Sequence, residues 1–211
     1  MELVTPHRTY KIGPFYSSEI EITDLTKAWI AISAAFAIVL GGASAIFSLK
    51  FLTFFFISAI TVGLGFILHE MGHKVVAQKY GCFAEFRADN MMLIFAIALS
   101  FLGFVFAAPG AVMISGHHVD RKRLGYIGAA GPIMSLSIAL IFFILYLVSN
   151  PLSLLGKVSG YGFAINSFIA LFNMIPFGMF DGYKIFQGSK IMWVVMTAIA
   201  GIATWYSGAL F

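Results

Sequence analysis

Two histidines and a glutamate stand at a spacing that suits metal chemistry. His69, Glu70 and His73 form the pattern H-E-x-x-H at the end of an apolar run over residues 57–68, which predicts a helix. Positions i and i+4 lie on one face of a helix, so both imidazoles can bind a single zinc ion with the glutamate beside it. Zinc lowers the pKa of bound water, and a carboxylate can take the proton as the water attacks a carbonyl. The pattern therefore predicts zinc-dependent hydrolysis with Glu70 as general base.

Chance is the competing explanation for this pattern. With five histidines and five glutamates in the chain, a random match to H-E-x-x-H is expected at about the 0.3% level. Imidazole and carboxylate side chains are also costly to bury in an apolar helix and usually serve a site there. We therefore favour the metal site over coincidence.

A zinc site in an enzyme needs a third protein ligand. Asp181 is the best candidate among the aspartates because it directly follows an apolar run over residues 163–180. Pro176, Gly178 and Gly182 around it would unwind a helix and let a side chain turn inward. The alternative is that Asp181 only caps a helix at a membrane surface.

The composition is that of an all-α polytopic membrane protein. Of the 211 residues, 60% are hydrophobic and only 10% are charged, too few polar residues to cover a soluble domain of this size. Apolar runs near 20 residues recur, each long enough to cross a bilayer. We expect five full crossings, at residues 29–47, 51–73, 124–148, 162–180 and 191–210.

The segment 91–115 has two interpretations. It is apolar enough for a sixth crossing, but Pro109 and Gly110 interrupt it, and the residues that follow, Ala111 to Ile114, suit a short strand. A helix of about 16 residues rises about 24 Å, and a strand of about 8 residues covers a similar distance. The segment is therefore also compatible with a re-entrant helix–strand hairpin that enters and leaves on the same side.

The distribution of lysine and arginine favours the hairpin. Six full crossings divide these residues seven to six between the two sides, whereas the hairpin divides them eleven to two. The positive-inside rule then places the N-terminus in the cytoplasm of a multi-pass cell-membrane protein. The hairpin also puts Asp181 on the same side as His69 and His73, near the cytoplasmic face.

The N-terminal part of the chain differs from the rest. Residues 1–26 form a polar segment in which the alternation over Glu19–Thr23 predicts a short strand and Asp24 could cap the next helix. Residues 27–211 are expected to form a single integral-membrane domain. Cys82 is the only cysteine, so no internal disulfide can form. The net charge of +4 is spread over loops and does not suggest nucleic acid.

The two motifs together resemble the site-2 protease family of intramembrane zinc metalloproteases. That family shows H-E-x-x-H on one helix and N-x-x-P…D-G on a later, broken one, matched here by His69–His73 and by Asn173, Pro176, Asp181 and Gly182. Gly131 and Pro132, at the opening of a central helix, also look similar. The chain departs from the family where Gly178, Met179 and Phe180 replace a second proline, and in the longer apolar segment 91–115.

The resemblance implies a zinc protease and a set of roles. Asp181 would be the third ligand of one zinc ion per chain, with His69 and His73. Asn173 would hold the substrate backbone or the oxyanion as a second catalytic residue beside Glu70. The substrate would be a membrane protein with a transmembrane segment, cut in or near the lipid bilayer.

Other functions stay open at this point. A membrane metal-ion transporter or a non-proteolytic metal-binding membrane protein could also place histidine and aspartate within spans. A transporter, however, needs no glutamate beside the metal, and a protease of soluble peptides is a further alternative. His117 and His118 are either a second metal site or part of a polar loop, and their basic surroundings favour the loop.

Overall fold

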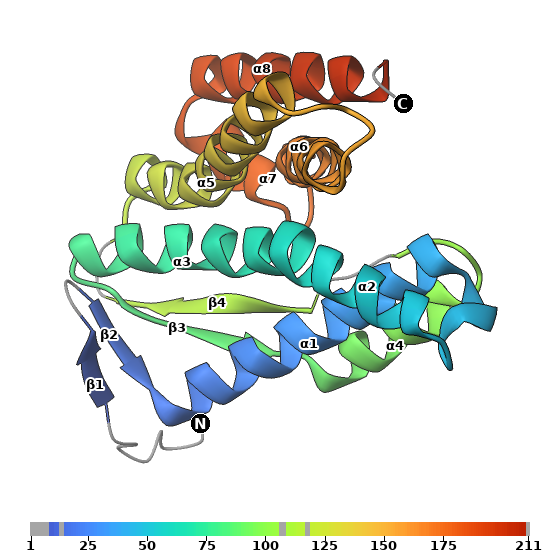
Figure 1. The fold of residues 1–211 in the computed structure, drawn as a ribbon. Coiled ribbons are helices and arrows are strands. Elements are labelled where there is room, and N and C mark those ends of the chain that lie inside the picture. The colour runs from blue at the N-terminus through green and yellow to red at the C-terminus, as the bar shows by residue number, and fades with distance from the viewer. Residues whose placement is uncertain (1–8, 13–14, 106–108, 117–118, 210–211) are drawn as a thin grey trace. The chain divides into compact units, whose positions relative to one another are not determined.

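The computed structural model describes residues 9–12, 15–105, 109–116 and 119–209 (Figure 1). It divides into two compact units, residues 1–59 with 77–117 and residues 60–76 with 118–211. The helices confirm an all-α polytopic membrane protein, because five of them are long and apolar enough to cross a bilayer. They are Glu19–Gly41, Leu49–Lys79, Arg121–Val148, Leu154–Phe172 and Lys190–Gly208.

The first unit begins with an antiparallel hairpin of β1 (Thr9–Ile12) and β2 (Phe15–Ser18). Helix α1 (Glu19–Gly41) follows, and a 3-10 turn, η1 (Ala43–Ala45), leads to α2 (Leu49–Ser58). A second antiparallel pair, β3 (Phe83–Ala88) and β4 (Gly110–Ser115), flanks the short helix α4 (Asn90–Ser100).

The N-terminal strand exists, but its predicted position at Glu19–Thr23 is wrong. These residues form the start of α1, and the Ser18 hydroxyl accepts a hydrogen bond from the Glu21 amide at 3.2 Å. Asp24 lies inside the helix and does not cap it. Ser18 followed by Glu21 has the spacing of a capping box, which is the signal that would have located the helix start.

The helix–strand interpretation of residues 91–115 is confirmed, with a shorter helix than expected. Helix α4 has 11 residues, about 16 Å of rise against a hydrocarbon core of about 30 Å. Ala88 pairs with Gly110, and the Asp89 amide donates to the Pro109 carbonyl at 3.0 Å. The chain therefore comes back to the point from which it left, and a sixth crossing is wrong.

The second unit holds the remaining long helices. A π-helical turn, η2 (Ala59–Gly63), joins α2 to α3 (Leu64–Lys79), and α5 (Arg121–Val148), α6 (Leu154–Phe172), α7 (Asp181–Gly188) and α8 (Lys190–Gly208) follow. The crossing expected at residues 162–180 begins earlier and ends at Phe172, since Ser153 caps α6 and the segment with Pro176 and Gly178 cannot continue a helix.

Small residues bring the helices of this unit close together. A Cβ on Gly72 of α3 would lie 2.7 Å from the Ala130 carbonyl oxygen of α5, and a Cβ on Gly188 of α7 would lie 2.8 Å from the Gly125 Cα of α5. Glycine at these positions lets α3 and α7 approach α5, as is usual where helices pack in membranes.

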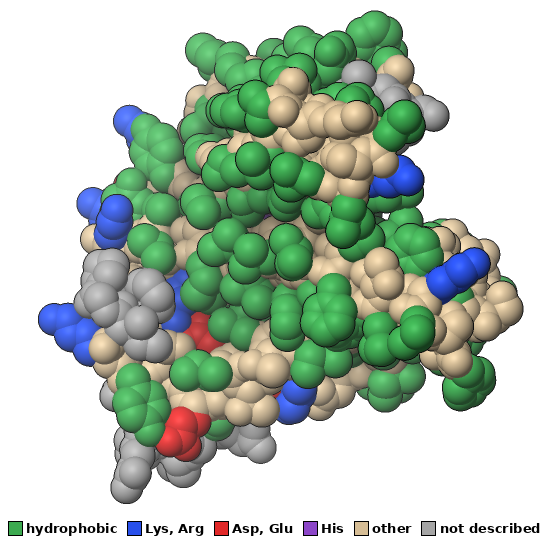
Figure 2. Space-filling view, viewed as in Figure 1, with side chains coloured by type: hydrophobic (Ala, Val, Ile, Leu, Met, Phe, Trp, Pro, Cys, Tyr) green, Lys and Arg blue, Asp and Glu red, His purple; other side chains and the backbone are tan. Residues whose placement is uncertain are grey.

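The outer surface of the long helices is apolar. Hydrophobic side chains cover much of the face shown in Figure 2, and on α8 Ile191, Ile202 and Trp205 are all more than two-thirds exposed. Such a surface suits contact with lipid, because lipid tails carry no penalty for exposed apolar groups.

Candidate metal centre

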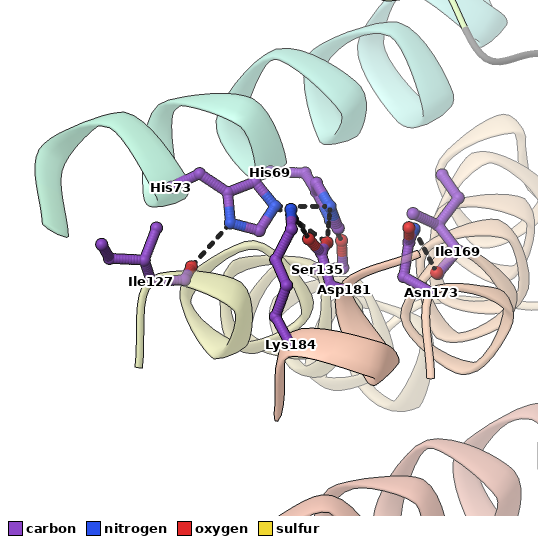
Figure 3. A network of polar contacts seen from close by, with 8 residues as sticks. All are labelled: His69, His73, Ile127, Ser135, Ile169, Asn173, Asp181 and Lys184. Carbon is purple, nitrogen blue, oxygen red and sulfur yellow. Dashed lines mark hydrogen bonds and ion pairs between the residues drawn. The ribbon is translucent and has the colours of Figure 1, made fainter. Parts of the chain in front are cut away.

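Three side chains from α3 and α7 converge on one point in the second unit (Figure 3). Asp181 Oδ2 lies 2.9 Å from His73 Nε2 and 3.3 Å from His69 Nε2, and the two Nε2 atoms are 3.2 Å apart. In a tetrahedral zinc site with bonds of about 2.0–2.1 Å, neighbouring ligand atoms lie about 3.3 Å apart. The triangle therefore has the size of three ligands around one zinc ion. All three side chains are buried.

The backbone of α5 determines which nitrogen of His73 is free. His73 Nδ1 lies 2.7 Å from the Ile127 carbonyl oxygen, which can only accept a hydrogen bond, so Nδ1 carries the proton. The other ring nitrogen, Nε2, then faces the Asp181 carboxylate, with a free lone pair when the ring is neutral. His69 is held in the same way, with Nδ1 2.9 Å from the Ser135 hydroxyl. Partners of this kind orient metal-binding histidines.

This arrangement fits a cation. When the ring of His73 is neutral with its proton on Nδ1, Nε2 and Asp181 Oδ2 are both acceptors, 2.9 Å apart in a buried position. Two buried acceptors this close repel each other unless positive charge lies between them. Two imidazole nitrogens and one carboxylate oxygen are also the ligand types that zinc takes in catalytic sites.

Gly131 of α5 leaves space beside these nitrogens. A Cβ on this residue would lie 2.2 Å from His73 Nε2 and 2.6 Å from His69 Nε2. Any larger side chain would fill the volume beside the ligand atoms. In the sequence, Gly131 was noted only as part of the resemblance to the family. The fold shows that it lies beside the candidate metal ligands.

The loop between α6 and α7 carries Asp181 into the site. The Gly182 amide donates to the Asn173 carbonyl at 2.6 Å, and a Cβ on Gly182 would lie 2.2 Å from the Met174 carbonyl oxygen. The glycine after the aspartate therefore lets the loop close tightly. The interpretation of Asp181 as a mere helix cap is wrong, because Phe180 is the N-cap of α7 and Asp181 contacts both histidines.

Lys184 is a residue of the site that sequence reasoning missed. Its Nζ lies 3.1 Å from Asp181 Oδ1, one turn along α7. Burial alone would raise the pKa of the Asp181 carboxyl, but the positive charge of Lys184, and that of His73 when its Nε2 is also protonated, hold that pKa well below its ordinary value. The carboxylate is therefore charged at neutral pH, as a metal ligand must be.

Glu70 follows the first histidine on α3 and is buried. Its charge is close enough to interact with His69, His73, Asp181 and Lys184. A buried carboxylate beside the first histidine is the type of residue that the proton transfer expected from the sequence requires.

Asn173 ends α6, and its backbone joins the site through the bond to Gly182. Its side-chain Nδ2 donates to the Ile169 carbonyl at 2.9 Å, and in Figure 3 the side chain lies apart from the histidine–aspartate group. Its predicted contact with substrate stays a prediction. His117 and His118 lie outside the described residues.

The chain is similar to proteins named as zinc metalloproteases. It is 41% identical over 184 residues to "Putative zinc metalloprotease MJ0611" of Methanocaldococcus jannaschii, a match that covers 86% of this chain and 91% of that protein. It is 24% identical over 147 residues to "Putative zinc metalloprotease YwhC" of Bacillus subtilis (strain 168), covering 61% of this chain and 66% of that protein. No protein-family model and no solved structure matches the chain.

Proposed function

Because this chain belongs to a family of zinc metalloproteases, we propose that it is an endopeptidase of the site-2 protease type that cuts membrane-spanning proteins within or close to the bilayer. The observation that carries the proposal is the triangle of His69, His73 and Asp181, which is built on apolar helices and has Glu70 next to it. Ligands buried among membrane helices give access to a peptide bond that soluble proteases cannot reach.

The residues of the site divide the reaction between them. When zinc is bound, it supplies a polarised water and a Lewis acid for the scissile carbonyl. Glu70 takes the proton of the attacking water and returns it to the leaving amine. Ser135 and the Ile127 carbonyl keep both imidazoles in the orientation that points Nε2 at the metal. Asn173 would steady the substrate backbone or the developing oxyanion.

The order of the elements supports an active site near the cytoplasmic face. Since residues 89–109 return to their starting point, α3 leaves the bilayer on the side from which α5 enters it. Helices α5 and α6 then cross twice, which brings Asp181 back to the side of His73. The excess of lysine and arginine on this side favours the cytoplasm of a cell membrane.

The substrate must unwind before it is cut, because helical carbonyls are hydrogen-bonded and shielded. Strand β4 pairs with β3 along one edge, and among the described residues no strand pairs with its other edge. An unwound substrate segment could add to that edge as a further strand. If a Met113→Pro variant cut a membrane substrate as fast as the parent, this route would be wrong.

The test compares the purified protein with Glu70→Gln and Asp181→Asn. We expect the parent to bind one zinc ion per chain and to cut a generic single-span substrate in bilayers. Glu70→Gln should keep zinc and lose cleavage, whereas Asp181→Asn should lose zinc. Zinc binding without cleavage by the parent, together with zinc flux into proteoliposomes, would favour a transporter instead. Faster cleavage of a soluble peptide than of the membrane substrate would contradict the intramembrane proposal.

A further inference from the structure

The two oxygens of the Asp181 carboxylate have different partners. Oδ2 faces His69 Nε2 and His73 Nε2, at 3.3 Å and 2.9 Å. Oδ1 accepts a hydrogen bond from Lys184 Nζ at 3.1 Å. One oxygen thus faces the two histidine nitrogens of the candidate metal site, and the other faces an ammonium group.

Lys184 is built into the site and is not a loose surface lysine. A Cβ on Gly128 of α5 would lie 3.0 Å from the Lys184 Cβ and 3.3 Å from the Asp181 carbonyl oxygen, so the stem of Lys184 packs against the bare backbone of α5. Lys184 and Asp181 are three residues apart on α7, which places them on adjacent turns of one face. The side chain of Lys184 is only one-third exposed.

We propose that Lys184 is a positioning residue that keeps Asp181 a one-oxygen ligand of the metal. A free carboxylate beside a zinc ion can bind through both oxygens and raise the coordination number. With Oδ1 held by Lys184, only Oδ2 reaches the metal, and the fourth position stays open for water, as a catalytic zinc site requires. This inference rests on the proposed zinc site and adds a residue that controls its geometry.

The electrostatics make this role distinguishable from simple support of Asp181. Lys184 carries a positive charge next to a cation site, so its removal takes away a repulsion and frees a second oxygen for the metal. Both effects favour tighter metal binding. If Lys184 only held Asp181 in place, its removal would instead weaken metal binding, because the ligand would become mobile.

The experiment uses the full-length protein in lipid nanodiscs, stripped of metal and reloaded with Co²⁺. Four-coordinate cobalt absorbs visible light more strongly than five-coordinate cobalt, so the spectrum reports the number of ligands. We expect Lys184→Met to give a weaker five-coordinate spectrum and a zinc Kd equal to or lower than that of the parent. Its kcat for substrate cleavage should fall about 10- to 100-fold with little change in KM.

Two further variants complete the test. Lys184→Arg keeps a charged donor and should retain the parent spectrum. Lys190→Met removes a lysine at the start of α8, whose Nζ lies 5.5 Å from the ring centre of Phe186, and should leave spectrum and cleavage unchanged. A parent-like cobalt spectrum in Lys184→Met would overturn the proposal, as would a loss of metal binding in that variant.

The spectrum does not depend on proteolysis. If Lys184→Met changes the cobalt spectrum while the parent cuts no substrate, the role of Lys184 stands and the protease proposal fails. If the parent cuts and the spectrum does not respond to Lys184, the protease stands and this inference fails.

Discussion

His69 and His73 can each offer Nε2 to a metal ion because each has a hydrogen-bond partner for Nδ1 on α5. The Ile127 carbonyl fixes the tautomer of His73, and the Ser135 hydroxyl holds His69. Ser135 thus forms a contact between α5 and α3, and its partner is a candidate metal ligand. The hydroxyl of Ser137, two residues further along α5, instead donates to the Ile133 carbonyl of its own helix.

The difference between the two serines gives a matched test. Ser135→Ala removes the partner of His69 and should raise the zinc Kd about 10- to 100-fold. Ser137→Ala deletes the same hydroxyl two residues away on α5 and should leave the zinc Kd unchanged. Competition with a chelator of known affinity measures both. Equal zinc affinity in the two variants would show that Ser135 does not orient the ligand.

Gly131 provides a second test of the packing around the candidate metal ligands. The Cβ of Gly131→Ala would lie 2.2 Å from His73 Nε2, so the variant should lose stoichiometric zinc while the helices remain folded. Gly201→Ala is the control, because the nearest atom to its Cβ would be Leu171 Cδ1 at 4.0 Å. Zinc content by elemental analysis and helix content by circular dichroism check the result. A zinc-loaded Gly131→Ala protein would contradict the packing at the site.

The loop from Asn173 to Asp181 shows how an element is shaped for a ligand. Helix α6 ends at Phe172, Gly178 adopts a φ of +66°, and the Gly182 amide returns to the Asn173 carbonyl. Trp193 Nε1 donates to the Met174 carbonyl at 2.7 Å and ties the same loop to α8. These bonds hold the loop so that α7 starts with Asp181 directed at the histidines.

A Gly182→Ala substitution should open the loop between α6 and α7 and displace Asp181. The added Cβ would lie 2.2 Å from the Met174 carbonyl oxygen, a contact that backbone atoms must move to relieve. We expect a lower Tm and a zinc Kd raised by more than about tenfold, since Asp181 is the proposed third ligand. Gly208→Ala near the end of α8, where a Cβ would meet nothing within 4 Å, should change neither quantity. An unchanged zinc Kd in Gly182→Ala would mean that the loop tolerates the shift.

The number of membrane crossings determines whether the H-E-x-x-H motif and Asp181 can lie on the same side of the membrane. Helix α4 is too short to span, and the pairing of β3 with β4 returns the chain to one side. If the five long helices all cross the bilayer, the end of α3, the start of α5 and the start of α7 lie on the same side. A sixth crossing would have separated the histidines from Asp181.

Labelling of single cysteines tests this arrangement. In a Cys82→Ser background, Lys79→Cys and Lys122→Cys should react with a membrane-impermeant maleimide only from the cytoplasmic side, and Leu152→Cys only from the opposite side. All three positions are exposed. Right-side-out and inverted vesicles distinguish the two faces. Reaction of positions 79 and 122 from opposite sides would restore the sixth crossing.

The sequence determined what depends on local spacing and on hydropathy. The interval from His69 to His73 is one helical turn, so two ligands on one face follow from the chain alone. Long apolar runs predicted the five crossings, although the fourth of them was placed about eight residues too late because its start is set by the Ser153 cap. Asp181 could be found because its surroundings contain residues that cannot continue a helix.

Other features of the site depend on which faces of distant helices meet, and these follow only from the tertiary structure. Ser135, Gly131 and the Ile127 carbonyl have ordinary local surroundings, and only the packing of α5 against α3 gives them their partners. Lys184 lies one turn from Asp181 on α7, so its partner is local, but its place beside the histidines is not. The short N-terminal strand was misplaced for a related reason, since five alternating residues fit the first turns of a capped helix as well as a strand. Local periodicity carries no information about partners far along the chain, so the environment of the ligands became visible only in the folded protein.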